Sequence, residues 1–380
     1  MQIANHSVQV KDAESTSRVP RPEPTGCPLQ LPLIAPRLLA WYDRSGRDLP
    51  WRRTADSYHI WLSEIMLQQT GVNAALPFYQ RFLEHFPTIS VLAAAPVERV
   101  VEQWAGLGYY SRARNLHRAA QIVVEKHQGA FPDDPRQILA LPGIGRSTAG
   151  AIGAIAFHRP TPILDGNVRR VLCRLFSLQE PPRSPAAERR LWSWAEALTP
   201  EERPGDYAQA IMDLGALLCT PARPDCAVCP LADLCRARQS GKEREIPVRQ
   251  RKKPVPLVEE VGILLNRKGR FLVRRRPLEG LLGGLWEFPT TRVAAEEGPE
   301  AAAARLLAEL GFRADPLPAG TVRQTYSHFR LALGLYLGEL TEISRTRTTD
   351  EETWLSPAEL VDLPLHGAHK KALPFLLRRG

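Results

Sequence analysis

Hydrophobic residues recur at helical spacing from about residue 31 to residue 238, and alternating strand-like runs are nearly absent from this stretch. The pattern therefore predicts an all-α domain. Helix start and stop residues divide the stretch into ten expected helices. These are Pro36–Ser45, Ser57–Gln69, Ala74–His85, Val97–Trp104, Ser111–Lys126, Pro135–Ala140, Arg146–Phe157, Asn167–Phe176, Ala186–Ala197 and Tyr207–Leu218.

After residue 257 the pattern changes to short runs in which apolar residues alternate with other residues. We expect strands at Val258–Leu265, Phe271–Arg275 and Phe329–Leu340. Two further runs, Pro299–Leu310 and His366–Leu377, have helical spacing. The second part should therefore be a smaller α+β domain.

Two polar segments complete the predicted organisation. Residues 1–30 are polar, rich in proline and without periodicity, so we expect a disordered tail. Residues 241–257 are charged and contain Pro247, Pro254 and Pro256, the composition of an extended linker. The all-α domain then covers 31–240 and the α+β domain 258–380, and two domains suit a chain of 380 residues.

The charge of the chain points to an anionic partner. Fifty basic and 41 acidic residues give a net charge of +9, which favours nucleic acid. No run approaches the ~20 apolar residues of a membrane helix, and the N-terminus lacks an apolar signal core. We expect a cytoplasmic monomer with no membrane partner, associated with the nucleoid if the source is bacterial.

Four of the six cysteines fall within seventeen residues, at Cys219, Cys226, Cys229 and Cys235. A reducing compartment makes disulfides poor candidates, so the group indicates a metal site. Structural zinc sites usually combine two close pairs from separate hairpins, whereas this segment holds one close pair in one winding loop. Four thiolates in one loop can enclose a cubane. The spacing favours a [4Fe–4S] cluster at 219–235, with zinc as the alternative.

A glycine-containing turn, Leu141-Pro-Gly-Ile-Gly145, separates two expected helices. Gly143 and Gly145 allow a tight turn that exposes backbone N–H groups at a helix N-terminus, where a DNA phosphate fits. Twenty residues after Gly145, Asp165 directly precedes another expected helix. A structural turn and a helix N-cap are the simpler interpretations of these two features.

The turn, the aspartate and the cysteine loop together resemble the helix-hairpin-helix DNA glycosylases of the endonuclease III type, over residues 31–238. Three further stretches resemble the MutY-type adenine DNA glycosylases of that superfamily. They are Leu49-Pro-Trp-Arg52, Trp61-Leu-Ser-Glu-Ile-Met-Leu-Gln-Gln-Thr70 and Gly106-Leu-Gly-Tyr-Tyr-Ser-Arg-Ala-Arg-Asn-Leu116.

Glu64 is the expected general acid. Its helical neighbours Ile60, Trp61 and Leu67 are apolar and only Gln68 is polar, and apolar surroundings raise the pKa of a carboxyl toward neutrality. A plain helix-surface glutamate is the alternative. The resemblance implies that Glu64 protonates adenine and that Asp165 stabilises the oxocarbenium-like sugar or captures it transiently.

Chemistry on a base requires that the base leave the duplex stack. The resemblance implies that Gln69 and Tyr109 wedge into the duplex and that Arg52 contacts the adenine pocket. For Tyr109, packing in a glycine-rich loop is the alternative.

A missing lysine bears on the mechanism. Strand-cleaving relatives carry a lysine in the hairpin motif, whose amine attacks the sugar. Here the corresponding position is Ser147, and no lysine occurs between Lys126 and Lys242. We therefore expect a monofunctional glycosylase that leaves an abasic site.

The second domain resembles the Nudix-like C-terminal domain of the same glycosylases, which reads 8-oxoguanine. Arg305 and Ala308 occupy two of the three glutamate positions of a hydrolytic Nudix helix, which leaves Glu309 alone. One carboxylate holds divalent metals poorly, so we expect binding without hydrolysis. The expected recognition loop is 325–329, where Ser327 could bond the modified guanine and His328 or Tyr326 could stack or contact phosphate. Tyr326 replaces the family's phenylalanine, and a plain strand entry is the alternative.

The predicted function is base-excision repair of duplex DNA that contains adenine opposite 8-oxoguanine or guanine. A thymine or pyrimidine glycosylase is the first alternative, against which Ser147 and the second domain argue. A non-catalytic mismatch sensor is the second alternative, against which the presence of both Glu64 and Asp165 argues.

Overall fold

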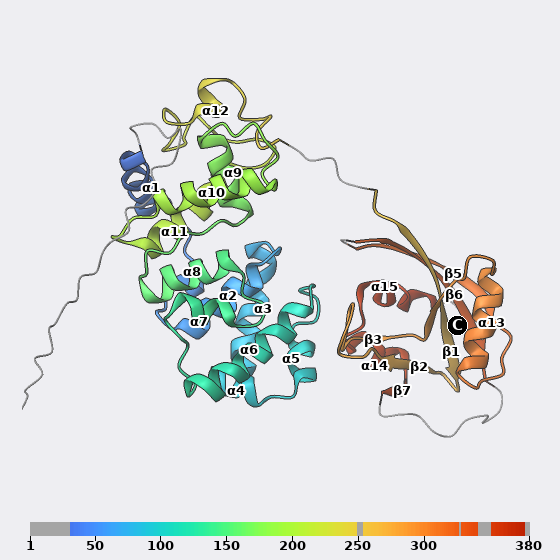
Figure 1. Cartoon of the computed structure of the whole chain (residues 1–380). Coiled ribbons are helices and arrows are strands. Elements are labelled where there is room, and N and C mark those ends of the chain that lie inside the picture. The colour runs from blue at the N-terminus through green and yellow to red at the C-terminus, as the bar shows by residue number, and fades with distance from the viewer. Residues whose placement is uncertain (1–30, 249–253, 327, 341–350, 377–380) are drawn as a thin grey trace, which may run out of the picture.

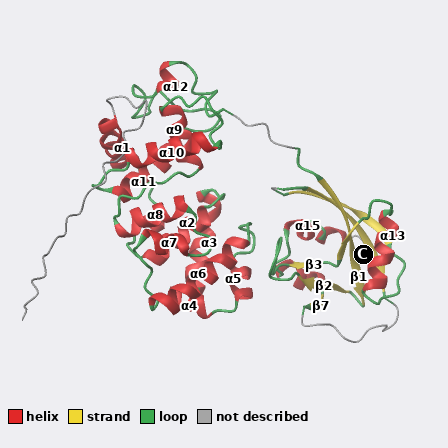
Figure 2. Cartoon of the chain, in the orientation of Figure 1, coloured by secondary structure: helices red, strands yellow, loops and turns green. Residues whose placement is uncertain are grey.

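The computed structural model describes residues 31–248, 254–326, 328–340 and 351–376. A helical part precedes a part built on a β-sheet (Figures 1 and 2). The expected 1–30 tail and residues 249–253 of the expected linker lie outside the described residues. Within the described residues, no helix has the length and apolar character needed to cross a bilayer.

All ten expected helices of the first part are present, with ends shifted by a few residues. The elements are α1 (Leu31–Ser45), η1 (Pro50–Arg52), α2 (Ser57–Leu67), α3 (Val72–His85), α4 (Ile89–Ala94), α5 (Val97–Gln103), α6 (Ser111–His127), α7 (Pro135–Ala140), α8 (Arg146–Phe157), α9 (Gly166–Leu175), α10 (Pro185–Leu198), α11 (Pro204–Asp213), η2 (Leu214–Leu218) and α12 (Arg236–Gln239). Sequence periodicity missed α4 and α12, which are too short to show a period.

The expected Tyr207–Leu218 helix is divided into two elements. α11 ends at Asp213, and η2 continues as a wider π-helical turn. Gly215 in this turn lies against Asn167, so a Cβ added to Gly215 would lie 2.6 Å from the Asn167 Cβ. Such π turns are often found at functional sites.

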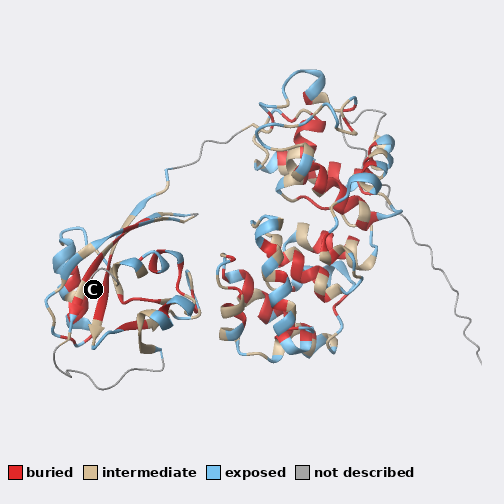
Figure 3. Cartoon of the chain, turned by 180° about the vertical axis from the view of Figure 1, so that it is seen from behind, coloured by how far each residue is buried: buried red, intermediate tan, exposed pale blue. Residues whose placement is uncertain are grey.

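The helices form two lobes with separate cores, and their buried residues are coloured red in Figure 3. Trp61, Phe82 and Trp104 are buried in the core of the lobe formed mainly by α2–α7. The second core lies among α1, α9, α10 and α11 and includes Leu172 and Leu191. α8 contributes residues to both cores, because it is apolar on all sides and its small residues allow close packing.

The second part is a mixed sheet with helices on both faces. Its strands are β1 (Leu257–Arg267), β2 (Arg270–Arg275), β3 (Trp286–Glu287), β4 (Thr290–Arg292), β5 (Leu317–Thr325), β6 (Arg330–Glu339) and β7 (Glu352–Leu355). Their order is β3-β2-β1-β6-β5, with β1 and β6 parallel, β4 beside β1 and β7 beside β2.

One face of this sheet packs on α13 (Pro299–Glu309), where Ile263 and Leu265 meet Leu306. The opposite face packs on α14 (Pro357–Asp362) and α15 (Gly367–Lys370), with Leu264 and Leu333 in the core. Alternate residues of β1 therefore enter different cores, as in a central strand that is covered on both sides.

Several elements of the second part were not predicted. β3, β4 and β7 have at most four residues, and the edge strand β5 contains Pro318 and a bulge at Gly320. The predicted His366–Leu377 helix is wrong in extent. α15 ends at Lys370 and a 3-10 turn, η3 (Leu373–Phe375), follows, because Pro374 has no N–H for a continuing helix.

Candidate active site

A cavity of about 240 Å³ lies at the junction of the two helical lobes. Glu64 of α2 and Asp165 at the start of α9 both line it. The other lining residues come from α2, η1, α3, α8, α9, α11, η2 and the loops between these elements, so the cavity exists only when both lobes are assembled. Among them are Arg47, Trp51, Arg52, Leu67, Ser147, Asn167, Gln209 and Met212.

Glu64 is placed by a helix that is otherwise almost wholly buried. Asp56 caps the N-terminus of α2 by accepting a hydrogen bond of 2.8 Å from the Tyr58 N–H. Burial raises the pKa of Glu64 to about 7, the negative charge of Asp165 adds to this effect, and Arg52 opposes it. At neutral pH a large fraction of Glu64 is therefore protonated.

Asp165 is placed by the close approach of its preceding segment to α8. A Cβ on Gly150 would lie 2.1 Å from the Pro162 carbonyl oxygen, so only glycine permits this packing. The Ser147 hydroxyl also accepts a hydrogen bond of 3.0 Å from the Leu164 N–H. Ser147 thus helps to hold the chain that leads into Asp165.

Asp165 is both a helix cap and a cavity residue. Its Oδ1 accepts a hydrogen bond of 2.7 Å from the Val168 N–H. Burial raises the pKa of Asp165, while hydrogen bonds from Val168 and Asn167 oppose the rise. These N–H groups favour the ionised form of Asp165, whereas no described residue donates such a hydrogen bond to Glu64, so the first proton of the pair belongs on Glu64.

Arg52 lines the cavity, and its guanidinium is bound by the buried carboxylate of Asp213. It donates hydrogen bonds of 2.7 and 2.9 Å to the two carboxylate oxygens of Asp213. Arg47 also donates to Asp213, whose side chain is fully buried. Burial alone would raise the pKa of Asp213, but the hydrogen bonds from Arg52 and Arg47 outweigh it and lower the pKa. Sequence reasoning missed Arg47 and Asp213.

Gln69 and Tyr109 are exposed and border one hollow of about 190 Å³, apart from the cavity. Their φ angles are +58° and +50°, in the left-handed region that side chains rarely adopt. Buried Arg112 lies beneath them. Its guanidinium donates to the carbonyls of Ile65, Met66, Gln68, Leu107 and Gly108 and to the Thr70 hydroxyl.

Arg112 therefore hydrogen-bonds both exposed loops, the one that contains Gln69 and the one that contains Tyr109. Sequence reasoning quoted this arginine within the Gly106–Leu116 motif but gave it no role. Its carbonyl partners are up to 47 residues distant, so the sequence did not show these contacts. The available signal was a charged residue between Ser111 and Ala113 at the start of an expected helix.

The glycine turn has the geometry that its sequence requires. Gly143 has a φ of +79°, and an added Cβ would lie 2.8 Å from the Asn115 Cβ. Gly145 is the N-cap of α8, and open space surrounds its Cβ position. The Gln68 side chain donates to the Gly143 carbonyl at 3.3 Å and so joins the turn to α2. The N-terminus of α8 is thus accessible to an anion.

The four cysteines line one small cavity beside Arg174 and Arg238. All four are free, and Arg174 donates to the Cys219 Sγ at 3.2 Å. Four thiol sulfurs around one cavity are a donor set that can hold a [4Fe–4S] cluster and that can also hold one Zn²⁺ ion.

The expected recognition loop connects β5 to β6. Ser327 lies outside the described residues, and His328 is exposed. On α13, Arg305 donates 2.9 Å hydrogen bonds to Glu297 and to Glu309. Glu309, the one carboxylate that matches a hydrolytic Nudix helix, is therefore paired with Arg305.

Two family descriptions match separate parts of the chain. Residues 62–197 match the HhH-GPD superfamily base excision DNA repair protein, and residues 260–374 match the NUDIX domain. The predicted fold class is confirmed by these matches.

Whole-chain comparisons extend the likeness across both parts. The adenine DNA glycosylase of Homo sapiens is 36% identical over 88% of this chain and 72% of its own length. The enzyme of the same name from Mus musculus is 35% identical over 88% and 76%. A solved thermostable thymine-DNA glycosylase superposes with a TM-score of 0.51 at 26% identity, and covers 56% of this chain and 97% of that one.

Proposed function

Because the chain belongs to the adenine DNA glycosylases of base excision repair, we propose that its substrate is adenine opposite 8-oxoguanine or guanine in duplex DNA. The observation that carries the proposal is the pair of carboxyl groups in one cavity. Glu64 is protonated near neutral pH, and Asp165 is held by N–H donors that favour its ionised form.

The two carboxyl groups divide the work of breaking the glycosidic bond. Glu64 passes its proton to a ring nitrogen of the flipped adenine, and the electron pair of the C1′–N9 bond leaves with the base. Ionised Asp165 stabilises the positive charge that develops on the sugar. Water then adds to C1′ and loses a proton, which leaves an abasic site.

The side chain at the hairpin supports hydrolysis without strand cleavage. Ser147 accepts a hydrogen bond from the Leu164 N–H, and no lysine occurs between Lys126 and Lys242. An amine that could form a Schiff base with the sugar is therefore missing from this stretch. We infer a monofunctional enzyme.

DNA is held by exposed loops and a helix N-terminus outside the cavity. Gln69 and Tyr109 enter the duplex beside the flipped base, and the turn at Gly143 and Gly145 takes a phosphate at the start of α8. Arg52, fixed by Asp213, borders the adenine.

The cysteine loop holds a [4Fe–4S] cluster through Cys219, Cys226, Cys229 and Cys235. When bound, the cluster crosslinks a segment that has little secondary structure. It takes no part in bond cleavage, since the cysteines and Glu64 line different cavities.

The second domain reads the base opposite adenine through the loop 325–329, including Ser327 and His328. It binds without hydrolysis, because Arg305 neutralises Glu309. The protein works as a monomer, and both of its domains face DNA.

A thymine glycosylase is the rival assignment on this scaffold. The thymine enzyme matches 56% of the chain, whereas the human adenine enzyme matches 88%, including the second domain. The adenine assignment therefore accounts for more of the molecule.

Labelled duplexes test the assignment. The protein is incubated with A opposite 8-oxoguanine, A opposite G, T opposite G, and G opposite 8-oxoguanine, and each sample is split before alkali treatment. We expect alkali-dependent scission of the first two duplexes only. Scission of T opposite G alone would refute the substrate, and borohydride trapping of an efficient covalent adduct would refute the monofunctional mechanism.

A further inference from the structure

The tyrosine that departs from the family's loop sequence has an internal partner. Tyr326 follows β5 directly, and its N–H donates to the Phe329 carbonyl at 2.9 Å, which closes the turn into β6. Its ring stacks on Phe329 with centroids 4.9 Å apart. The hydroxyl lies 3.3 Å from Nδ1 of His366, the residue that precedes α15.

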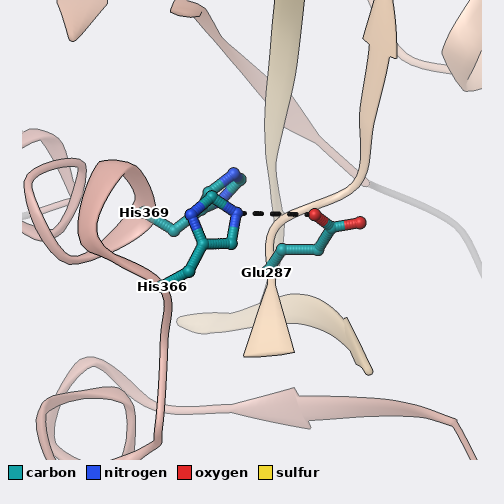
Figure 4. Close-up of side chains that lie close together, drawn as sticks. All are labelled: Glu287, His366 and His369. Carbon is teal, nitrogen blue, oxygen red and sulfur yellow. Dashed lines mark ion pairs between the residues drawn. The ribbon is translucent and has the colours of Figure 1, made fainter. Parts of the chain in front are cut away.

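The contact continues into the interior of the domain. Nε2 of His366 lies 3.5 Å from Oε2 of Glu287 (Figure 4). The two ring nitrogens of His366 thus contact different groups, Nδ1 the Tyr326 hydroxyl and Nε2 the carboxylate. Both side chains are nearly inaccessible to solvent. Glu287 also accepts a 3.0 Å hydrogen bond from Arg274 and pairs with Arg276. The carboxylate is thus fixed from two sides.

These charges determine where the protons lie. Burial alone would raise the pKa of Glu287, but His366 and the two arginines lower it to about 2. Burial lowers the pKa of His366, so its ring is neutral at pH 7. A neutral ring beside a carboxylate places its proton on Nε2. Nδ1 then has a free lone pair, and the Tyr326 hydroxyl is the donor that satisfies it.

The same residues are a poor metal site. Glu287, His366 and His369 have ligand atoms within 4.8 Å of one another. However, Arg274 and Arg276 already neutralise the carboxylate. His369 Nδ1 accepts a 2.9 Å hydrogen bond from the Phe288 N–H, so its other nitrogen carries a proton. The cluster serves as a hydrogen-bonded support.

We propose that the Tyr326 hydroxyl, held by His366 and Glu287, positions Tyr326 and Phe329 at the turn from β5 to β6 and so sets the preference for 8-oxoguanine over guanine. The inference rests on the proposed role of this loop. A phenylalanine at 326 would leave the buried His366 Nδ1 without its donor, and an unpaired buried acceptor is costly. The pair Tyr326 and His366 is thus this chain's own means of holding the loop.

Single-turnover excision on A:8-oxoguanine and A:guanine duplexes tests this inference, with the half-saturating enzyme concentration separated from the plateau rate. For Tyr326→Phe we expect about a tenfold higher half-saturating concentration on A:8-oxoguanine. The A:guanine value and both plateau rates should stay unchanged. Tyr336→Phe, which removes a hydroxyl from the other face of the sheet, is the matched control.

A double substitution distinguishes loss of the Tyr326–His366 contact from a general destabilisation of the domain. His366→Leu alone should also weaken the A:8-oxoguanine reaction. Together with Tyr326→Phe it removes both partners, so the combined loss should be smaller than the sum of the two.

Equal values for Tyr326→Phe and the unaltered protein would overturn the inference. So would parallel losses on both duplexes, or strictly additive losses in the double variant. Absence of any 8-oxoguanine preference in the unaltered protein would instead refute the proposed role of the second domain.

Discussion

At the scale of single residues, the proposed chemistry rests on two carboxyl groups in different surroundings. The apolar neighbours of Glu64 in the sequence predicted a raised pKa, and the structure raises it to about 7. The N-cap interpretation of Asp165 is confirmed, and the same residue also lines the cavity. The buried Asp213 beneath Arg52 was not predicted, since it lies 161 residues from its partner.

Replacement of the expected acid should separate catalysis from binding. Glu64→Gln keeps the size of the side chain but removes its proton. We expect the single-turnover excision rate to fall by about 10²- to 10⁴-fold. Affinity for A:8-oxoguanine duplex in a gel-shift titration should stay within about threefold, because α2 does not need the charge to fold. Loss of binding would show a structural role for Glu64.

At the scale of elements, long periodic helices were predictable and short or exposed ones were not. The ends of α7 and α8 agree with the pattern. The strand β5 was missed, because Pro318, Gly320 and an exposed edge hide its alternation. The same limit applies to contacts between elements. The fan of hydrogen bonds from Arg112 joins two loops that the sequence shows only as separate motifs.

Arg112→Lys should impair base flipping. A lysine keeps the positive charge but has at most three donors on one atom, so it cannot hold both loops. We expect excision to slow by about tenfold or more, as Gln69 and Tyr109 lose their fixed positions. Fluorescence of 2-aminopurine next to the target adenine measures the flipping step. Arg118→Lys, an exposed arginine on the same helix, is the control, and equal rates for both variants would contradict the role.

The cysteine loop should matter for folding before chemistry. Cys226→Ser removes one thiolate from the set, so we expect a lower thermal midpoint and a loss of visible iron–sulfur absorbance. The plateau excision rate per DNA-bound molecule should be retained, because the loop and Glu64 line separate cavities. Cys27→Ser is the control. A slower plateau with an unchanged midpoint would contradict this assignment.

At the scale of the whole molecule, both domains meet at α6. Arg114 donates to the carbonyls of Gly283 at 3.1 Å and Gly280 at 3.2 Å. Leu285 of the second domain joins the core of the first lobe. The sequence predicted two domains and a linker but not this contact, since backbone carbonyls leave no sequence pattern.

Removal of the Arg114 contact should weaken the contribution of the second domain to binding of A:8-oxoguanine duplex. Arg114→Ala should raise the half-saturating concentration on A:8-oxoguanine by about three- to tenfold, because the second domain must then be ordered when DNA binds. The plateau rate should not change, and Arg118→Ala is the control. A change in plateau rate with unchanged half-saturation would point to an effect on the cavity instead.

The pH profile of single-turnover excision from A:8-oxoguanine duplex tests the central claim most directly. In the proposed mechanism Glu64 acts in its protonated form, so its raised pKa of about 7 predicts a rate that falls as the pH rises above 7, by about tenfold per unit well above it. The same mechanism uses Asp165 in its ionised form, so the rate should also fall in acid and the profile should be bell-shaped. In Glu64→Gln the limb near pH 7 should vanish together with most of the rate. A rate that is flat or rises through pH 7 in the unaltered protein would contradict Glu64 as the proton donor.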